Sequence, residues 1–220
     1  MYSLESLDPM LFRFRLRHPS ALFAGFAFSA MAFPVNAQPV TPAVASPVAV
    51  EPENILQLDL STGGRVTIQL YPDKAPAHVE RIKTLTRQGF YNNLAFHRVI
   101  EGFMAQTGDP TGTGTGDSEL PDLKAEFNPS PHLRGTVSMA RTNDPDSANS
   151  QFFICFQPRF SLDKKYTVLG RVISGMQYVD SIERGEPPTS PSRILQASIA
   201  ADNLPPPAGV AASVNQPSTN

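Results

Sequence analysis

The sequence predicts one mainly β domain, folded as a sandwich or a closed barrel with two helices. Short runs of alternating apolar and polar residues recur along the chain, separated by turn residues, which is typical of such folds. Only two segments have the 3.6-residue apolar spacing of a helix. The chain has 220 residues, of which 40% are hydrophobic, enough for one sizeable core but not comfortably for two.

The first two strands are predicted to form a hairpin. Leucine occupies every second position of residues 56–60, and residues 66–70 repeat the alternation with Val, Ile and Leu. The turn between them contains Gly63 and Gly64, so the two runs are expected to pair with one buried face. Further strands are expected at residues 95–100, 103–107, 135–140, 151–156, 167–173 and 193–200.

Two segments are predicted to be helices. Residues 77–88 place apolar side chains on one face, with Pro76 before the first turn and Gly89 after the last. Residues 176–184 repeat this spacing and stop at Gly185. Two such helices could cover the open ends of a barrel.

The ends of the chain are predicted to lie outside the folded domain, which spans residues 54–203. Residues 1–37 have the features of an export signal, with a basic segment, a 13-residue apolar run and small residues before a cleavage site after Ala37. The apolar run is shorter than the roughly 20 residues that span a bilayer. We therefore expect a periplasmic or secreted protein with no stable membrane insertion after cleavage, and an uncleaved anchor is the alternative. Residues 38–53 are expected to form a Pro/Ala-rich linker, and residues 204–220 a disordered Pro-rich tail.

Charge and residue content exclude several classes of function. Residues 1–37 hold three of the 18 basic and two of the 20 acidic residues, which leaves 15 against 18 and does not favour nucleic acid. His78, His97 and His132 have no second ligand at metal spacing, so no metal or other cofactor is expected. Cys155 is the only cysteine, which rules out an intrachain disulfide and indicates a small buried hydrophobe.

Two further catalytic patterns are absent or incomplete. No Gly-x-Ser-x-Gly occurs, so a serine hydrolase of that kind is not supported. The glycine-rich residues 108–116 lack the Lys-Ser/Thr that would contact a nucleotide, and they are expected to form a flexible surface loop.

Arg98 is the residue that a plain core does not explain. In an alternating strand it would share a face with Phe96 and Ile100, and an arginine on an apolar face needs a partner or a function. The simple alternative is that Arg98 is exposed, or paired with a carboxylate such as Glu101 or Asp109.

Several stretches in series resemble the cyclophilins, the cyclosporin-binding peptidyl-prolyl cis-trans isomerases. They are residues 96–100 (FHRVI), 102–109 (GFMAQTGD), 135–140 (GTVSMA), 150–154 (SQFFI), 162–163 (LD) and 166–170 (YTVLG). Their order and spacing agree over nearly all of residues 54–200. The resemblance implies a closed antiparallel barrel of eight strands capped by two helices.

The resemblance also implies an active site, carried over position by position. Three residues fall on catalytic positions: Arg98, Phe103 and Gln106. Eight fall on substrate-binding positions: Met104, Ala140, Arg141, Gln151, Phe153, Phe160, Leu162 and Tyr166. Arg141 stands where the well-studied eukaryotic members have Asn, and Tyr166 where they have His. Their pocket Trp is replaced by Phe160 or Ser161, which implies weak cyclosporin binding at most.

The implied function is isomerisation of X-Pro bonds in unfolded or partly folded exported proteins. Arg98 would stabilise the twisted prolyl nitrogen, and the apolar side chains would hold the proline ring. A non-catalytic module that binds proline-containing segments on the same fold is the main alternative. A ligand-carrying barrel is a third, although bulky inward side chains favour a packed interior.

Overall fold

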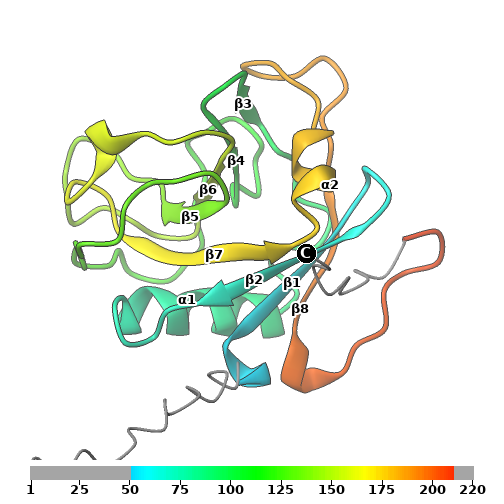
Figure 1. The fold of residues 1–220 in the computed structure, drawn as a ribbon, viewed down its shortest axis with the longest axis horizontal. Helices are drawn as coiled ribbons and strands as arrows, with labels where there is room; N and C mark the ends of the chain where they lie inside the picture. Colours follow the sequence, from blue (N-terminus) through cyan, green and yellow to red (C-terminus); the bar gives the residue numbers. More distant parts are fainter. Residues whose placement is uncertain (1–50, 211–220) are drawn as a thin grey trace, which may run out of the picture. The chain divides into compact units, whose positions relative to one another are not determined.

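A computed structural model describes residues 51–210 of the chain (Figure 1). The expected signal segment, the cleavage site and most of the expected linker lie outside these residues. The eight strands are β1 (Ile55–Leu60), β2 (Arg65–Leu70), β3 (Arg98–Ile100), β4 (Met104–Thr107), β5 (Thr136–Met139), β6 (Phe152–Cys155), β7 (Val168–Ser174) and β8 (Ile194–Ile199). The two helices are α1 (Pro76–Arg87) and α2 (Met176–Asp180), and three 3-10 turns are η1 (Pro52–Asn54), η2 (Phe160–Leu162) and η3 (Ala200–Asp202).

The strands form one sheet in the order β3-β4-β6-β5-β7-β2-β1-β8, and every neighbouring pair is antiparallel. The sheet curls so that its edge strands β3 and β8 approach each other, as the predicted barrel requires. The seam is not a full ladder, however. It consists of an isolated bridge between Ala95 and Arg193 and a few flanking hydrogen bonds, such as Phe96 N to Ser192 O at 2.9 Å. "Closed" therefore overstates the barrel slightly, because regular pairing on β3 begins only at Arg98.

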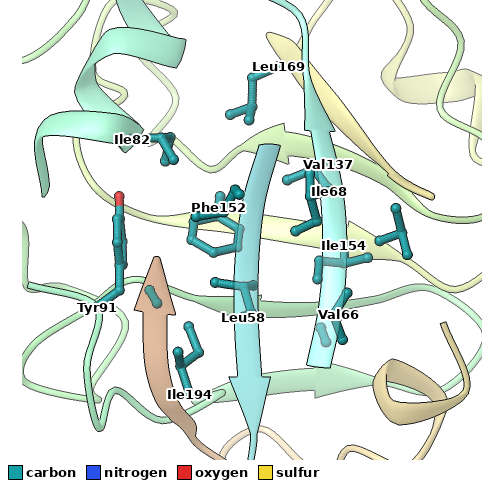
Figure 2. Packing of buried hydrophobic residues seen from close by; sticks show 14 of the residues in the cluster. Leu58, Val66, Ile68, Ile82, Tyr91, Val137, Phe152, Ile154, Leu169 and Ile194 are labelled. Atoms are coloured by element: carbon teal, nitrogen blue, oxygen red, sulfur yellow. The ribbon is translucent and has the colours of Figure 1, made fainter. Parts of the chain in front are cut away.

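Alternation along the strands creates two separate apolar clusters. On β5 and β6, Val137, Phe152 and Ile154 point into the main core and are fully buried. Figure 2 shows these side chains packed with Leu58, Val66 and Ile68 of the predicted hairpin. Burying one such side chain stabilises the fold by roughly 1.5–3 kcal/mol. The interior is thus packed with bulky side chains, as the sequence predicts.

The alternate residues of the same strands face the other way. Met104, Phe153 and Cys155 form a second, smaller buried cluster on the outer face of the sheet. Partly buried apolar side chains pack against it: Ile100, Phe103, Ala140, Leu162 and Tyr166. A strand has a side-chain period of two, so the strands that complete the core also present this outer cluster.

Helix α1 matches its prediction within one residue at each end. Pro76 occupies its first turn, where the missing N–H costs nothing. Its start is closed by Glu126, whose carboxylate oxygens accept hydrogen bonds from the backbone N of Ala77 and of His78, each at 3.1 Å. The Nδ1 of His78 lies 2.6 Å from the same carboxylate. The carboxylate therefore serves as a cap supplied from a distant loop.

Helix α2 is shorter than predicted. It ends at Asp180 rather than at residue 184, and Arg184 donates hydrogen bonds to the carbonyls of Asp180 and Ile182. The chain leaves the helix early because Gly185 pairs with Val99 across the sheet edge. Among residues 51–210, neither helix is long and apolar enough to cross a membrane.

The folded part of the chain continues past the expected boundary at residue 203. Arg65 donates a hydrogen bond to the carbonyl of Leu204 at 3.2 Å, and Gln196 donates one to that of Pro205 at 3.0 Å. The first residues of the expected tail are therefore attached to the sheet, and residues 211–220 lie outside the described part.

Candidate active site

The outer cluster is built on a single row of residues across three neighbouring strands. The register places Arg98 opposite Gln106, and Gln106 opposite Phe153. Directly opposed residues in antiparallel strands share one face, with Cβ atoms about 5 Å apart. One guanidinium, one amide and one aromatic ring are therefore aligned by backbone pairing alone.

A cavity of about 450 Å³ opens over this row. Nine of the eleven predicted site residues line it: Arg98, Phe103, Met104, Gln106, Ala140, Arg141, Phe153, Leu162 and Tyr166. The sequence did not indicate five of the six other lining residues, namely Gly112, Thr113, Gly114, Glu186 and Pro187. The sixth is His97, for which the sequence predicts a structural histidine within a strand rather than a site residue. The first three belong to the glycine-rich loop and the last two to the segment after α2.

Phe153 forms the floor of the cavity. Its ring is held on one side by Tyr166, edge to face at 5.9 Å between centroids, and on the other by the stacked ring of His132 at 6.2 Å. His132 is fully buried, with Nδ1 2.9 Å from Asp163 Oδ1 and Nε2 3.2 Å from Ser138 Oγ. His132 is thus a supporting residue, a role that its place in the sequence does not indicate.

Hydrogen bonds also fix the Asp163 carboxylate beneath the floor. Burial raises the pKa of Asp163, but hydrogen bonds from the backbone and ring of His132 outweigh that effect and leave the pKa below its usual value.

The side chain of Arg141 lies on the rim and is held in place. Its guanidinium donates to the carbonyl of Lys165, at 2.7 Å from Nη2, and to that of Thr142 at 2.8 Å. It also stacks on the ring of Tyr166, with 4.4 Å between the guanidinium carbon and the ring centroid. The arginine that replaces the asparagine of the eukaryotic pattern is therefore secured by carbonyls and a ring.

Arg98 makes a different ion pair from the two considered in the sequence. Its Nε donates to Glu186 Oε2 at 2.8 Å, and Nη1 lies 3.4 Å from the Oε1 of Gln106. Glu101 instead pairs with Arg184. Phe96 does not share a face with Arg98 but points into the main core, because the chain before residue 98 is not in strand geometry.

The glycine-rich loop of residues 108–116 lies largely at the surface, as expected, but hydrogen bonds to Asp109 anchor it, which corrects the expectation that it is flexible. Asp109 is buried and accepts hydrogen bonds from the N–H and hydroxyl of Thr111, each at 2.7 Å, and from the N–H of Gly114 at 2.5 Å. Burial raises the pKa of Asp109, but these hydrogen bonds prevail and lower it overall. Gly108 is required at its position, since a Cβ there would lie 2.5 Å from the carbonyl oxygen of Ser150.

Gln151 lies beside the main cavity rather than in it. It lines a smaller adjoining cavity of about 320 Å³ together with Gln106. Its Oε1 accepts from Gln106 Nε2 at 2.9 Å, and its own amide donates to the carbonyl of Gly116 at 2.9 Å. The amides therefore connect the row of Arg98, Gln106 and Phe153 to the glycine-rich loop.

Phe160 is not brought to the cavity. Its side chain lies on η2 and is 64% exposed, whereas Leu162 of the same turn points inward. A short 3-10 turn spreads successive side chains around its axis, so only one of the two can face the pocket.

The site has no features of metal or thiol chemistry. Among residues 51–210 no cluster of His, Cys, Asp or Glu side chains is suited to hold a metal ion. Cys155 is fully buried beside the floor, and burial raises its pKa to about 12, so it stays a thiol at neutral pH.

Comparison with known proteins agrees with this geometry. Residues 56–199 match the family described as "Cyclophilin type peptidyl-prolyl cis-trans isomerase/CLD". A probable peptidyl-prolyl cis-trans isomerase of Brucella suis is 46% identical over 193 residues, which cover 80% of this chain and 98% of that protein. A peptidyl-prolyl cis-trans isomerase of Helicobacter pylori is 44% identical over 127 residues, covering 56% of this chain and 74% of that protein.

Two solved structures share the fold. The cyclophilin AquaCyp293 from Hirschia baltica superposes with a TM-score of 0.65 at 32% identity, over 71% of this chain and 77% of that one. A Cryptosporidium parvum cyclophilin-type isomerase, solved in the presence of the dipeptide Ala-Pro, gives a TM-score of 0.62 at 27% identity, over 66% and 98%. Sequence, fold and site geometry agree, and the chain belongs to the cyclophilin-type peptidyl-prolyl cis-trans isomerases.

Proposed function

We propose that Arg98 is the catalytic donor that lowers the barrier to X-Pro rotation. An X-Pro bond resists rotation by roughly 20 kcal/mol because the nitrogen lone pair is delocalised into the carbonyl. As the bond twists, the lone pair returns to the prolyl nitrogen, which becomes a hydrogen-bond acceptor. A fixed donor aimed at that nitrogen binds the transition state more tightly than either planar ground state.

The single observation that supports this role is the placement of Arg98 in the cavity. Its Nε is bound to Glu186 and its Nη1 contacts Gln106, while no partner of Nη2 is found among residues 51–210. Arginine stays protonated at every physiological pH, so a donor remains available throughout.

The apolar side of the cavity is proposed to hold the proline ring. Phe103, Met104, Phe153 and Leu162 line it. Fixing the ring while the preceding residue rotates confines the motion to one bond. Gln106 and the backbone near Arg141 would bind the amides that flank the proline.

Arg98→Ala tests the assignment directly. Loss of one transition-state donor costs about 10²- to 10³-fold in turnover in comparable sites, and we expect a similar fall in kcat/KM on a short X-Pro peptide. Arg134→Ala is the matched control, because Arg134 is also a half-exposed arginine in an ion pair, with Asp180, but lies outside the cavity. Circular dichroism and the melting midpoint would verify the fold of both variants. Activity of Arg98→Ala within about threefold of wild type would refute the role.

The alternative of a non-catalytic binding module is tested by the same isomerase assay on the wild-type protein. A module that only holds proline segments would show no isomerase activity in the wild-type protein, and binding of a Pro-containing peptide would be its sole measurable property.

We propose weak cyclosporin binding at most, because Phe160 points away from the cavity. A fluorescence or calorimetric titration against cyclosporin measures this.

We further propose that the substrates are proline-containing segments of exported proteins in the cell envelope. Residues 1–37 support this, through the basic segment, the 13-residue apolar run and the small residues before Ala37. N-terminal sequencing of the protein recovered from a periplasmic extract should begin at Gln38. Recovery only from the cytoplasm with the first 37 residues intact would contradict the proposal.

A further inference from the structure

Glu186 lies beside Arg98 because of backbone pairing. Val99 and Gly185 exchange two hydrogen bonds, at 2.8 and 2.9 Å, which makes them directly opposed residues. The next pair in this antiparallel register is Arg98 and Glu186, so their side chains project to the same side. Gly185 is required for the turn that carries Glu186, since a Cβ there would lie 2.5 Å from the Cα of Pro188.

The carboxylate of Glu186 is part of the cavity wall. Among the residues of 51–210 that line the main cavity, Glu186 is the only acidic one, and the other charged side chains are Arg98 and Arg141. Arg141 is bound to the carbonyls of Lys165 and Thr142. Burial lowers the pKa of the nearby His97, which is therefore neutral at pH 7. Of the charged side chains that line the cavity, Arg98 and Glu186 are the two joined in an ion pair.

The carboxylate can also accept a further partner. Its Oε2 accepts from Arg98 Nε at 2.8 Å, and no partner of Oε1 is found among residues 51–210. The side chain is 51% exposed. A cationic group of a bound peptide could therefore reach Oε1 without displacing Arg98, whereas an anionic group would be repelled by Glu186 and would compete with it for the guanidinium.

We propose that Glu186 is a specificity-determining residue, which favours substrates with a basic residue next to the X-Pro bond and disfavours those with an acidic one. This inference rests on the proposed role of Arg98 at the same site. Ion pairs at exposed positions contribute up to about 1 kcal/mol, which corresponds to a preference of roughly threefold to fivefold for Lys over Ala.

The experiment measures kcat/KM on short peptides with Lys, Ala or Glu placed immediately before or after the proline. In the wild-type protein, kcat/KM is expected to decrease in the order Lys, Ala, Glu for the residue on at least one side of the proline. The Lys peptide should exceed the Glu peptide by roughly tenfold, since the Lys-to-Ala and Ala-to-Glu differences in free energy add. The preference should shrink in 1 M salt, where the Debye length is about 3 Å. The variant Glu186→Gln should abolish the order or invert it, because Arg98 and Arg141 are then the remaining charged lining side chains, and Glu186→Lys should invert it.

Glu101→Gln is the matched control. Glu101 also forms a 2.8 Å ion pair with an arginine, Arg184, but does not line the cavity, so this variant should keep the wild-type order. An equal Lys-to-Glu ratio in wild type and Glu186→Gln, or no charge preference in wild type at low salt, would overturn the inference. Such a result leaves the role of Arg98 intact, because that role is judged by Arg98→Ala on the Ala peptide alone.

Discussion

Replacing His132 by Ala would test whether the floor of the pocket depends on the buried layer beneath it. The imidazole stacks on Phe153, and its nitrogens lie 2.9 Å from Asp163 Oδ1 and 3.2 Å from Ser138 Oγ. Two hydrogen bonds are worth about 1 kcal/mol each, and the cavity left by the ring adds a similar amount. We expect the free energy of unfolding to fall by about 3 kcal/mol, and the melting midpoint by roughly 6–12 °C.

The isomerase activity of His132→Ala is also expected to change. Total stability of a domain is about 5–15 kcal/mol, so the variant should remain folded at 25 °C. Phe153 would lose the ring that supports one of its faces, and a displaced pocket wall lowers catalysis even when the chemistry is untouched. We expect kcat/KM on an X-Pro peptide to fall about tenfold, with Arg98 still in place.

The measurement is urea unfolding together with a peptide isomerase assay on the folded protein. Asp163→Asn is the milder comparison, because an amide oxygen can still accept from the backbone N–H of His132, which donates to Asp163 at 2.8 Å. A stability loss below about 1 kcal/mol for His132→Ala, or unchanged kcat/KM, would show that Phe153 does not need this support.

Four further outcomes follow from titratable side chains that are buried or hydrogen-bonded in the fold. Burial lowers the pKa of His78 below its ordinary value of 6.5, so the unfolded chain binds a proton that the folded chain does not. The free energy of unfolding should therefore decrease as the pH falls below about 6.5. This decrease should be less steep in the variant His78→Gln. Burial raises the pKa of Glu126, but hydrogen bonds from His78 and the helix N–H groups outweigh this effect and lower the pKa overall. Glu126 should therefore add a further loss of unfolding free energy below about pH 4.5. Cys155 should not react with a thiol reagent at pH 8 until urea unfolds the protein. Asp59→Ala should cost about 3–5 kcal/mol in a denaturation assay, because Asp59 is fully buried and binds Arg65 through both oxygens.

The sequence predicted most of the strands because alternation is a local property. Residues 56–60 and 66–70 carry their buried face in the spacing of their leucines, valine and isoleucine, and both appear as strands. The sequence places the short β3 correctly but predicts it three residues too long. Ala95 forms only an isolated bridge, and its partner Arg193 lies about a hundred residues away, so the local pattern could not show where regular pairing begins.

The site was predictable where a motif of the family resemblance covers it, which includes Phe153, Leu162 and Tyr166 as well as residues on β4. Phe103, Met104 and Gln106 lie close in sequence, and the family resemblance located them. Glu186 and His132 could not be inferred in the same way, because their roles depend on pairing with Val99's strand and on packing beneath Phe153. No local pattern in the sequence indicates contacts across such separations.

The two-sided use of β4 and β6 has a consequence for how the site can move. On β6, Phe153 faces the pocket and is flanked by Phe152 and Ile154, which face the main core, so this wall of the site cannot loosen without opening the core on the other side. The amide protons paired between these strands should exchange with solvent only through global unfolding. Substrate would then meet a preformed wall, and the conformational cost of binding would fall mainly on the flexible peptide.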